Sequence, residues 1–73
     1  MAEIRVESEI PGKVIAIEVS PGEEIEEDDP ILILESMKME IPVASPVDGT
    51  VKEILVQLED TVSEGDPVAV VEG

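Results

Sequence analysis

The stretch Glu-Ser-Met-Lys-Met-Glu, residues 35–40, joins two copies of one sequence pattern. When residues 3–35 are aligned with residues 40–72 at a constant offset of 37, Gly12 falls on Gly49 and no gap is needed. Twelve of the aligned pairs are identical, and several others exchange one aliphatic residue for another. Two copies are too few for a solenoid, in which each unit needs stacked neighbours. We therefore expect one domain over residues 1–73, with an approximate internal two-fold axis that presents residues 36–39 once, at one end.

The composition restricts the chemistry that the chain can perform by itself. Its 73 residues include no cysteine, histidine, phenylalanine, tyrosine or tryptophan. Thiol and imidazole catalysis, Cys/His metal sites and base-stacking platforms are therefore excluded. A chain of this length is near the size at which one core is only marginally sufficient, which leaves no room for a deep catalytic pocket. We expect an aliphatic core and no enzymatic activity of the chain's own.

The charge is strongly one-sided, with 19 acidic residues against 4 basic ones and a formal net charge of −15. Binding to nucleic acid or to anionic membranes requires a cationic surface, so neither partner is expected. Two interpretations stay open. The charge forms a solvated acidic shell that keeps the domain soluble, or it steers the domain toward basic partners or reflects adaptation to salt.

The sequence contains no targeting or membrane signal. The N-terminus lacks the basic stretch and the apolar run of a signal peptide. No apolar stretch approaches the length that spans a bilayer. The absence of cysteine is compatible with a reducing compartment, and we expect a cytoplasmic protein.

Short apolar segments bounded by glycine and proline indicate strands. Residues 3–7 alternate with period two, residues 13–19 read as a second strand, and residues 31–34 are the most strongly apolar. No helical period is sustained over a dozen residues. Because the second copy repeats this plan, the sequence predicts an all-β domain of about eight short strands, in a sandwich or a flattened barrel.

Turn residues stand at equivalent places in the two copies. Gly12 and Gly49 are expected to need positive φ in turns. Gly22 follows a proline in a tight turn and is also free to take positive φ. Glycine at 65, where the first copy has Asp28, predicts a left-handed backbone at both positions, since aspartate tolerates this conformation better than most residues do.

The segment between the copies is predicted to be a hairpin tip. The strand 31–35 runs into Ser36-Met37-Lys38-Met39 and the strand 40–44 returns, so Lys38 is exposed where another enzyme can reach it. Glu35 and Glu40 lie nearby and stabilise the charged ammonium, which is the wrong direction for spontaneous nucleophilicity. A Lys38 amine that attacks an activated acyl group therefore needs another enzyme to deprotonate it.

Residues 35–40 resemble the biotin attachment motif of biotinyl domains, the carboxyl carrier parts of biotin-dependent carboxylases and decarboxylases such as acetyl-CoA carboxylase. The resemblance covers nearly the whole chain, because Pro11-Gly12 and Pro46-Val47-Asp48-Gly49 also look like turns of that family. It implies a flattened β-barrel or sandwich of two quasi-symmetric four-stranded halves, with the Met-Lys-Met hairpin at one end. Two residues depart from the family pattern: Ser36 stands where many members have alanine, and Asp28 where a turn glycine is usual.

The resemblance also implies the chemistry of the hairpin. Lys38 would carry biotin covalently on its ε-nitrogen, attached by a biotin protein ligase through biotinyl-adenylate. Glu35, Ser36, Met37 and Met39 would complete the attachment site. Biotin would take a carboxyl group at a biotin carboxylase and deliver it at a carboxyltransferase. The cofactor does the chemistry, while the protein is a compact non-catalytic body that brings it to both sites.

The sequence leaves two questions open, the role of the two methionines and whether the domain carries biotin, carries lipoate or is unmodified. Met37 and Met39 either cover aliphatic core, as flexible methionines do, or help the ligase and the carboxylase recognise the site, as the resemblance implies. A lipoyl carrier of a 2-oxoacid dehydrogenase-type complex has a related fold, although lipoyl domains usually place Asp-Lys-Ala at the tip. An unmodified β scaffold would show no mass increment on Lys38 and no response to a biotin ligase.

Overall fold

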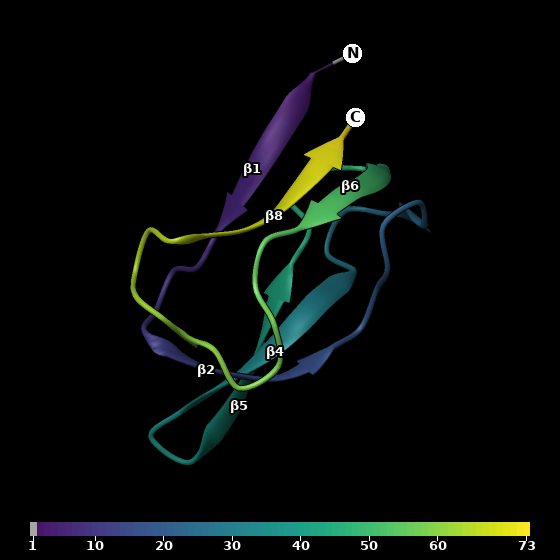
Figure 1. The fold of residues 1–73 in the computed structure, drawn as a ribbon. Coiled ribbons are helices and arrows are strands. Elements are labelled where there is room, and N and C mark those ends of the chain that lie inside the picture. Colours follow the sequence, from purple (N-terminus) through teal and green to yellow (C-terminus); the bar gives the residue numbers. More distant parts are fainter. Residues whose placement is uncertain (1) are drawn as a thin grey trace.

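The computed structural model describes residues 2–73, which form eight β-strands and no α-helix. The strands are short, as the spacing of glycine and proline predicts. Their bounds are β1 Glu3–Glu7, β2 Gly12–Ile17, β3 Glu24–Ile25, β4 Pro30–Ser36, β5 Met39–Ala44, β6 Gly49–Ile54, β7 Thr61–Val62 and β8 Pro67–Glu72. Figure 1 follows them from the N-terminus to the C-terminus, and the prediction of an all-β fold is confirmed.

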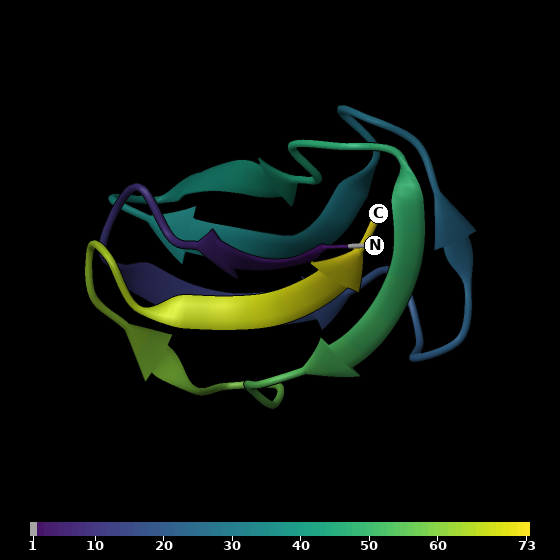
Figure 2. The ribbon, with the colours of Figure 1, turned by 90° about the horizontal axis from the view of Figure 1, so that it is seen from above.

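The strands form two four-stranded antiparallel sheets, and each sheet contains strands of both repeats. One sheet has the order β1-β8-β6-β3, and the other has the order β5-β4-β2-β7. Exchanging every strand for its repeat partner (β1 for β5, β2 for β6, β3 for β7, β4 for β8) converts one order into the other. Figure 2 shows the two curved layers enclosing a common interior. The two-fold relation expected from the sequence therefore extends to the strand order.

The register of the strand pairs also repeats. Glu3 faces Glu72 across β1 and β8, and the equivalent residues Glu40 and Glu35 face each other across β5 and β4. Each pairing contains one irregularity, and the two irregularities fall at equivalent points of β4 and β8. The two halves therefore share their local geometry as well as their topology.

Strands β1 and β5 each end a sheet, so each has one edge without a strand partner. Arg5 on β1 and Pro42 on β5 occupy equivalent positions. A charged residue on an edge strand and a proline, which has no N–H to donate, both discourage pairing with another chain. The repeats thus protect their edges by different chemical means.

The interior is aliphatic, as the composition predicts. Its largest fully buried apolar side chains are Ile31, Leu32, Leu34, Val14, Val51, Val68 and Val71. All of them belong to β2, β4, β6 and β8, the four strands that have a neighbour on both sides within their sheet. Ser8 and the equivalent Ser45 are buried as well, and each hydroxyl donates to a backbone carbonyl two residues further on. Within residues 2–73, no buried side-chain nitrogen or oxygen lacks a hydrogen-bond partner.

Residues with positive φ occupy equivalent positions in the two halves. Asp28 has a φ of 75° and Gly65 a φ of 87°, so the left-handed backbone predicted for both is confirmed. Gly22 has a φ of 96°, also as predicted, and its equivalent Glu59 has a φ of 73°. The residue type at 59 gives no indication of this conformation, because glutamate rarely adopts it, and only the equivalence to Gly22 points to it.

The prediction of positive φ at Gly12 and Gly49 is wrong, because these glycines begin β2 and β6 and neither has a positive φ. What they allow is a close approach of two backbone segments. A Cβ on Gly12 would lie 3.0 Å from the carbonyl oxygen of Glu35, and a Cβ on Gly49 would overlap the carbonyl oxygen of Glu72. The close approach is therefore repeated in both halves, like the register.

The molecule is elongated, with principal extents of 36 × 19 × 18 Å. The β4–β5 hairpin projects at one end, away from the end at which the two termini lie (Figure 1). The N–H of Gly73 donates to the carbonyl oxygen of Ala2 at 3.0 Å, so the two ends of the described chain are side by side. In residues 2–73 the structure has no helix of the length and apolarity needed to cross a membrane.

Candidate functional site

The candidate attachment site is the hairpin that β4 and β5 form. The two strands pair as far as Ser36 and Met39, which leaves only Met37 and Lys38 as the turn. Met37 has a φ of 52° and Lys38 a φ of 66°. Positive φ at both central residues is the pattern of a type I′ turn, whose twist matches that of the flanking strands. The tip is shorter than the four residues expected, because Ser36 and Met39 continue the strands.

Neither tip residue is of the kind that this turn favours. Type I′ turns prefer asparagine, aspartate and glycine, and other L-residues meet a steric cost of roughly 1–2 kcal/mol in the left-handed region. Unfavourable backbone conformations of this kind are often found at functional sites. The residues at positions 37 and 38 are therefore not those that would give the most stable turn, which indicates a function for their side chains.

All five predicted site residues lie together at this end of the molecule. Met37 is 92% exposed and Met39 is 59% exposed. Lys38 and Glu35 are exposed, and Ser36 is half-buried. The interpretation that the methionines cover the core does not hold for Met37, which lies almost wholly in solvent. Two exposed thioether side chains beside an exposed amine instead provide an apolar surface that another protein can contact.

The charged side chains around the tip are of both signs. Across the sheet, Glu35 lies between Lys13 on β2 and Glu40 on β5. Like charges directly opposite each other on neighbouring strands destabilise the pair. No ion pair involves these residues in the described part of the chain. Glu40, which lies on the edge strand β5 and faces only Glu35, is therefore the carboxylate most available to a basic partner.

At the opposite end of the molecule, Glu3, the repeat equivalent of Glu40, has an ion-pair partner. There the ammonium group of Lys52 donates to the carboxylate of Glu3 and forms an ion pair with it. This hydrogen bond and the charge of Glu3 raise the pKa of Lys52 above its usual value of 10.5. Lys52 is thus held by a partner, whereas no hydrogen bond or ion pair of the described residues involves the Lys38 side chain.

The site can receive an acyl group but has no group that activates the amine. Within residues 2–73, no cluster of acidic side chains is arranged to hold a metal ion. An exposed primary amine at a two-residue tip fits a covalent amide with a cofactor carboxyl group, because nothing surrounds it that a bulky substituent would displace. The chemistry that the arrangement allows is acylation of Lys38 by a reagent that another protein presents.

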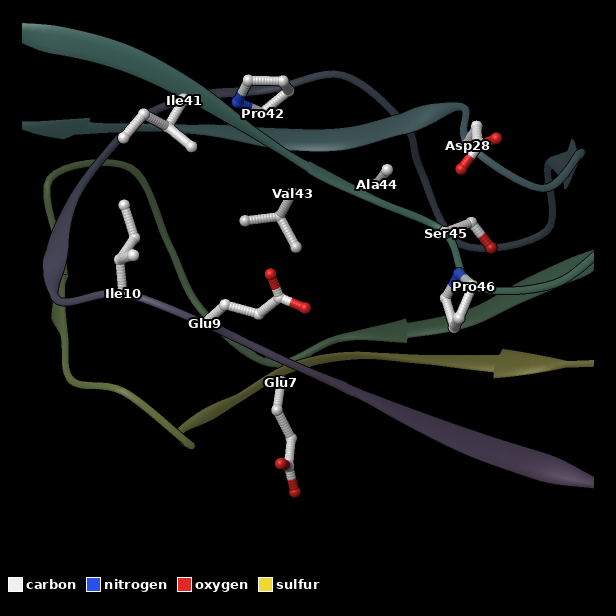
Figure 3. A pocket seen from close by; sticks show the side chains of 10 residues that line it. All are labelled: Glu7, Glu9, Ile10, Asp28, Ile41, Pro42, Val43, Ala44, Ser45 and Pro46. Carbon is white, nitrogen blue, oxygen red and sulfur yellow. The ribbon is translucent and has the colours of Figure 1, made fainter.

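A groove beside the hairpin was not foreseen from the sequence. It lies between β5 and the segment that follows β1, and Glu9, Ile10, Ile41 and Val43 are among its lining residues (Figure 3). These residues are far apart in the chain, so no local pattern brings them together. The sequence shows only that several of its lining residues, Asp28 and Pro42 among them, differ in type from their repeat equivalents, which for these two are Gly65 and Arg5.

Comparison with known proteins places the hairpin in a family context. Residues 3–71 match the model of a family described as "Biotin-requiring enzyme". Over 38 residues the chain is 47% identical to the biotinylated protein TB7.3 of Mycobacterium tuberculosis, a match that covers 52% of this chain and 54% of that protein. Over 37 residues it is 43% identical to the gamma subunit of glutaconyl-CoA decarboxylase from Acidaminococcus fermentans, covering 51% of this chain and 26% of the subunit. The matched segment thus spans about half or less of these relatives' length.

Solved structures show the same fold as a small part of two large enzymes. Urea carboxylase of Kluyveromyces lactis superposes with a TM-score of 0.93 and 32% identity, over 99% of this chain and 6% of that one. A single-chain, multi-domain long-chain acyl-CoA carboxylase superposes with a TM-score of 0.87 and 26% identity, over 93% of this chain and 7% of that one. Both superpositions support the sandwich of two quasi-symmetric halves.

Proposed function

We propose that the chain, which belongs to the family of biotin-requiring enzymes, is a non-catalytic biotin carboxyl carrier with Lys38 as its attachment residue. Residues 1–73 would act as one carrier domain. The observation that supports this most directly is the position of Lys38, exposed and unpaired at a strained two-residue tip, inside the segment that matches the family. Lys13 and Lys52 lie within strands β2 and β6, and Lys52 is held by Glu3.

The attachment step needs a biotin protein ligase. The ligase would remove a proton from the Lys38 ammonium, and the neutral Nζ would attack the carbonyl carbon of biotinyl-adenylate. A C–N bond forms, the C–O bond to the phosphate of AMP breaks, AMP leaves, and the nitrogen loses a second proton to become an amide. The chain contributes the geometry: β4 and β5 hold the amine away from the body, where the ligase can enclose it.

The carrier role follows from the same geometry. When attached, biotin supplies a ureido nitrogen that accepts and releases a carboxyl group. The chain contributes a compact body and an exposed tip that two active sites can receive in turn, a biotin carboxylase and a carboxyltransferase. Tethering raises the local concentration of the cofactor at each site that the carrier can reach. Met37 and Met39 would be contacted by these enzymes, and Glu35 and Ser36 would support the tip from β4.

Intact-mass spectrometry tests the proposal. The protein is incubated with a biotin protein ligase, biotin and Mg-ATP, and the modified peptide within residues 31–52 is mapped. We expect one biotin adduct on the wild type, on Lys13→Arg and on Lys52→Arg, and none on Lys38→Arg, with equal melting temperatures. An adduct on Lys38→Arg would refute the site. If the folded wild type takes no adduct from the ligase, biotin is the wrong cofactor, and a lipoyl adduct formed by a lipoate ligase would then support the lipoyl carrier.

A further inference from the structure

Two grooves of the molecule are related by the internal two-fold. The β5 groove is lined by Ile41–Ala44, Ser45, Pro46, Glu7, Glu9, Ile10 and Asp28. Adding 37 to the residue numbers of the first repeat, and subtracting 37 from those of the second, carries all these residues except Ile10 onto residues that line a second groove, the β1 groove, along the other edge strand. The two grooves adjoin, because Glu7, Glu9, Ala44 and Pro46 line both. Because the backbones are equivalent, the differences between the grooves reflect side chains. The chain therefore contains its own control for the groove next to Lys38.

The β5 groove begins at the base of the hairpin and has an apolar floor. Ile41, on β5 three residues after Lys38, lies in it with Val43 and Ile10, and all three are half-buried (Figure 3). Its volume is about 320 Å³, enough for a long side chain. Glu9 reaches over the floor toward Val43, whereas Glu7 points away (Figure 3). An apolar floor with a carboxylate above it suits an aliphatic stem that ends in a cation.

The β1 groove lacks this combination. Arg5 takes the place of Pro42, and Gly65 takes the place of Asp28. The β1 groove has no carboxylate at the position of Asp28 but is lined by Glu64, so each groove has three carboxylates, and the β1 groove differs in carrying a cation of its own, Arg5. Among the described lining residues of the β5 groove there is no cation, so its negative charge is not neutralised from within. The divergence of the repeats has made the groove beside the hairpin the more negative of the two.

The hairpin tip alone offers little surface for specific recognition. A stable protein–protein interface buries on the order of 800 Å² on each partner, more than two exposed methionines provide. The ligase acts on the unmodified protein and must select Lys38 among three lysines, so it needs contacts beyond the tip. The β5 groove is the recess that starts on the hairpin's own strand.

We propose, on the premise that the chain is a biotin carrier, that the β5 groove receives an arginine or lysine side chain of the biotin protein ligase. Its methylene stem packs on Ile10, Ile41 and Val43, and its charged end pairs with Glu9 and Asp28. Charge complementarity identifies the occupant, because a carboxylate-rimmed groove repels an acidic segment and leaves a neutral one without partners for the carboxylates. The contact positions the domain so that Lys38 enters the ligase active site.

The internal symmetry supplies the test. The double variant Asp28→Gly/Pro42→Arg gives the β5 groove the two residues that the β1 groove already has at equivalent positions, so the backbone tolerates both. The control, Glu18→Gln/Glu23→Gln, changes the net charge by the same two units at exposed residues that line neither groove. Biotinylation is followed by a biotin protein ligase assay with biotin and Mg-ATP, varying the domain concentration and the NaCl concentration.

For the double variant we expect kcat/KM to fall about tenfold, equivalent to about 1.4 kcal/mol, through a higher KM at unchanged kcat, with a weaker dependence on salt. The control keeps the wild-type KM within about twofold. Equal KM values for the double variant and the control would overturn the proposal. So would normal biotinylation of the double variant followed by slow carboxylation, which would assign the groove to the carboxylase. A wild type that takes no biotin refutes the carrier function itself, a separate outcome.

Discussion

The backbone of Gly49 lies so close to the carbonyl group of Glu72 that a Cβ on residue 49 would overlap the carbonyl oxygen. The equivalent contact between Gly12 and Glu35 is looser, with 3.0 Å between a built Cβ and the oxygen. Both contacts join the start of one strand to the end of a central strand in the same sheet, β6 to β8 and β2 to β4. They hold the base of the hairpin and the terminal end of the molecule in the same way.

Gly49→Ala should lower the free energy of unfolding by about 1–3 kcal/mol, because the added methyl group must displace backbone rather than a flexible side chain. Gly12→Ala should cost less, since its Cβ has slightly more room. For a domain of this size, each kcal/mol corresponds to roughly 4–8 °C in Tm, so thermal unfolding followed by circular dichroism separates the two variants. A Gly49→Ala protein that melts with the wild type would show that the close approach is not tight.

Met37→Asn should raise the free energy of unfolding by up to about 1 kcal/mol, because asparagine tolerates the left-handed backbone of a type I′ turn better than methionine does. The same variant should be biotinylated more slowly, since it removes the most exposed thioether. Urea unfolding and the ligase assay measure the two effects on one sample. If stability rises and the biotinylation rate is unchanged, Met37 is a turn residue without a role in recognition.

Glu59→Gly should also stabilise the fold, by roughly 0.5–1 kcal/mol, because it replaces a strained residue by the glycine that the first repeat has at Gly22. Loss of a negative charge contributes to any gain, so Glu59→Gln is the matched control: it removes the charge but keeps the strained φ. The urea concentrations at the unfolding midpoints of Glu59→Gly and Glu59→Gln are compared. A Glu59→Gln protein as stable as Glu59→Gly would attribute the whole gain to charge.

Added NaCl should raise the Tm at neutral pH. The chain has a net charge of −15, and its described residues contain a single ion pair, so repulsion between carboxylates opposes the compact state. The screening length falls from roughly 30 Å at 0.01 M salt to roughly 3 Å at 1 M, which removes most of that repulsion. The Glu18→Gln/Glu23→Gln variant should show a smaller increase. A Tm that is flat or falls over this range would mean that the acidic residues are too far apart to repel.

The strand-rich fold, the aliphatic core and the position of Lys38 could be predicted from the sequence, because they depend on local chemistry. Period-two alternation marks a strand wherever it lies, and proline and glycine bound it. Asp28 and Gly65 could be recognised as left-handed positions, since two residue types that tolerate that conformation stand at one place of the repeat. The repeat also predicted that the segment between its two copies, residues 36–39, occurs once and lies at one end of the domain.

Tertiary structure alone decided how the copies combine. Each repeat contributes two strands to each sheet, and this arrangement, rather than a turn, explains why glycine is favoured at 12 and 49: another strand's backbone crowds the place of a Cβ, more closely at Gly49 than at Gly12. The β5 groove likewise depends on segments more than thirty residues apart in the chain, such as Glu9 and Val43. Periodicity and turn chemistry describe a residue through its neighbours in the chain, whereas close approach and grooves depend on neighbours that only folding supplies.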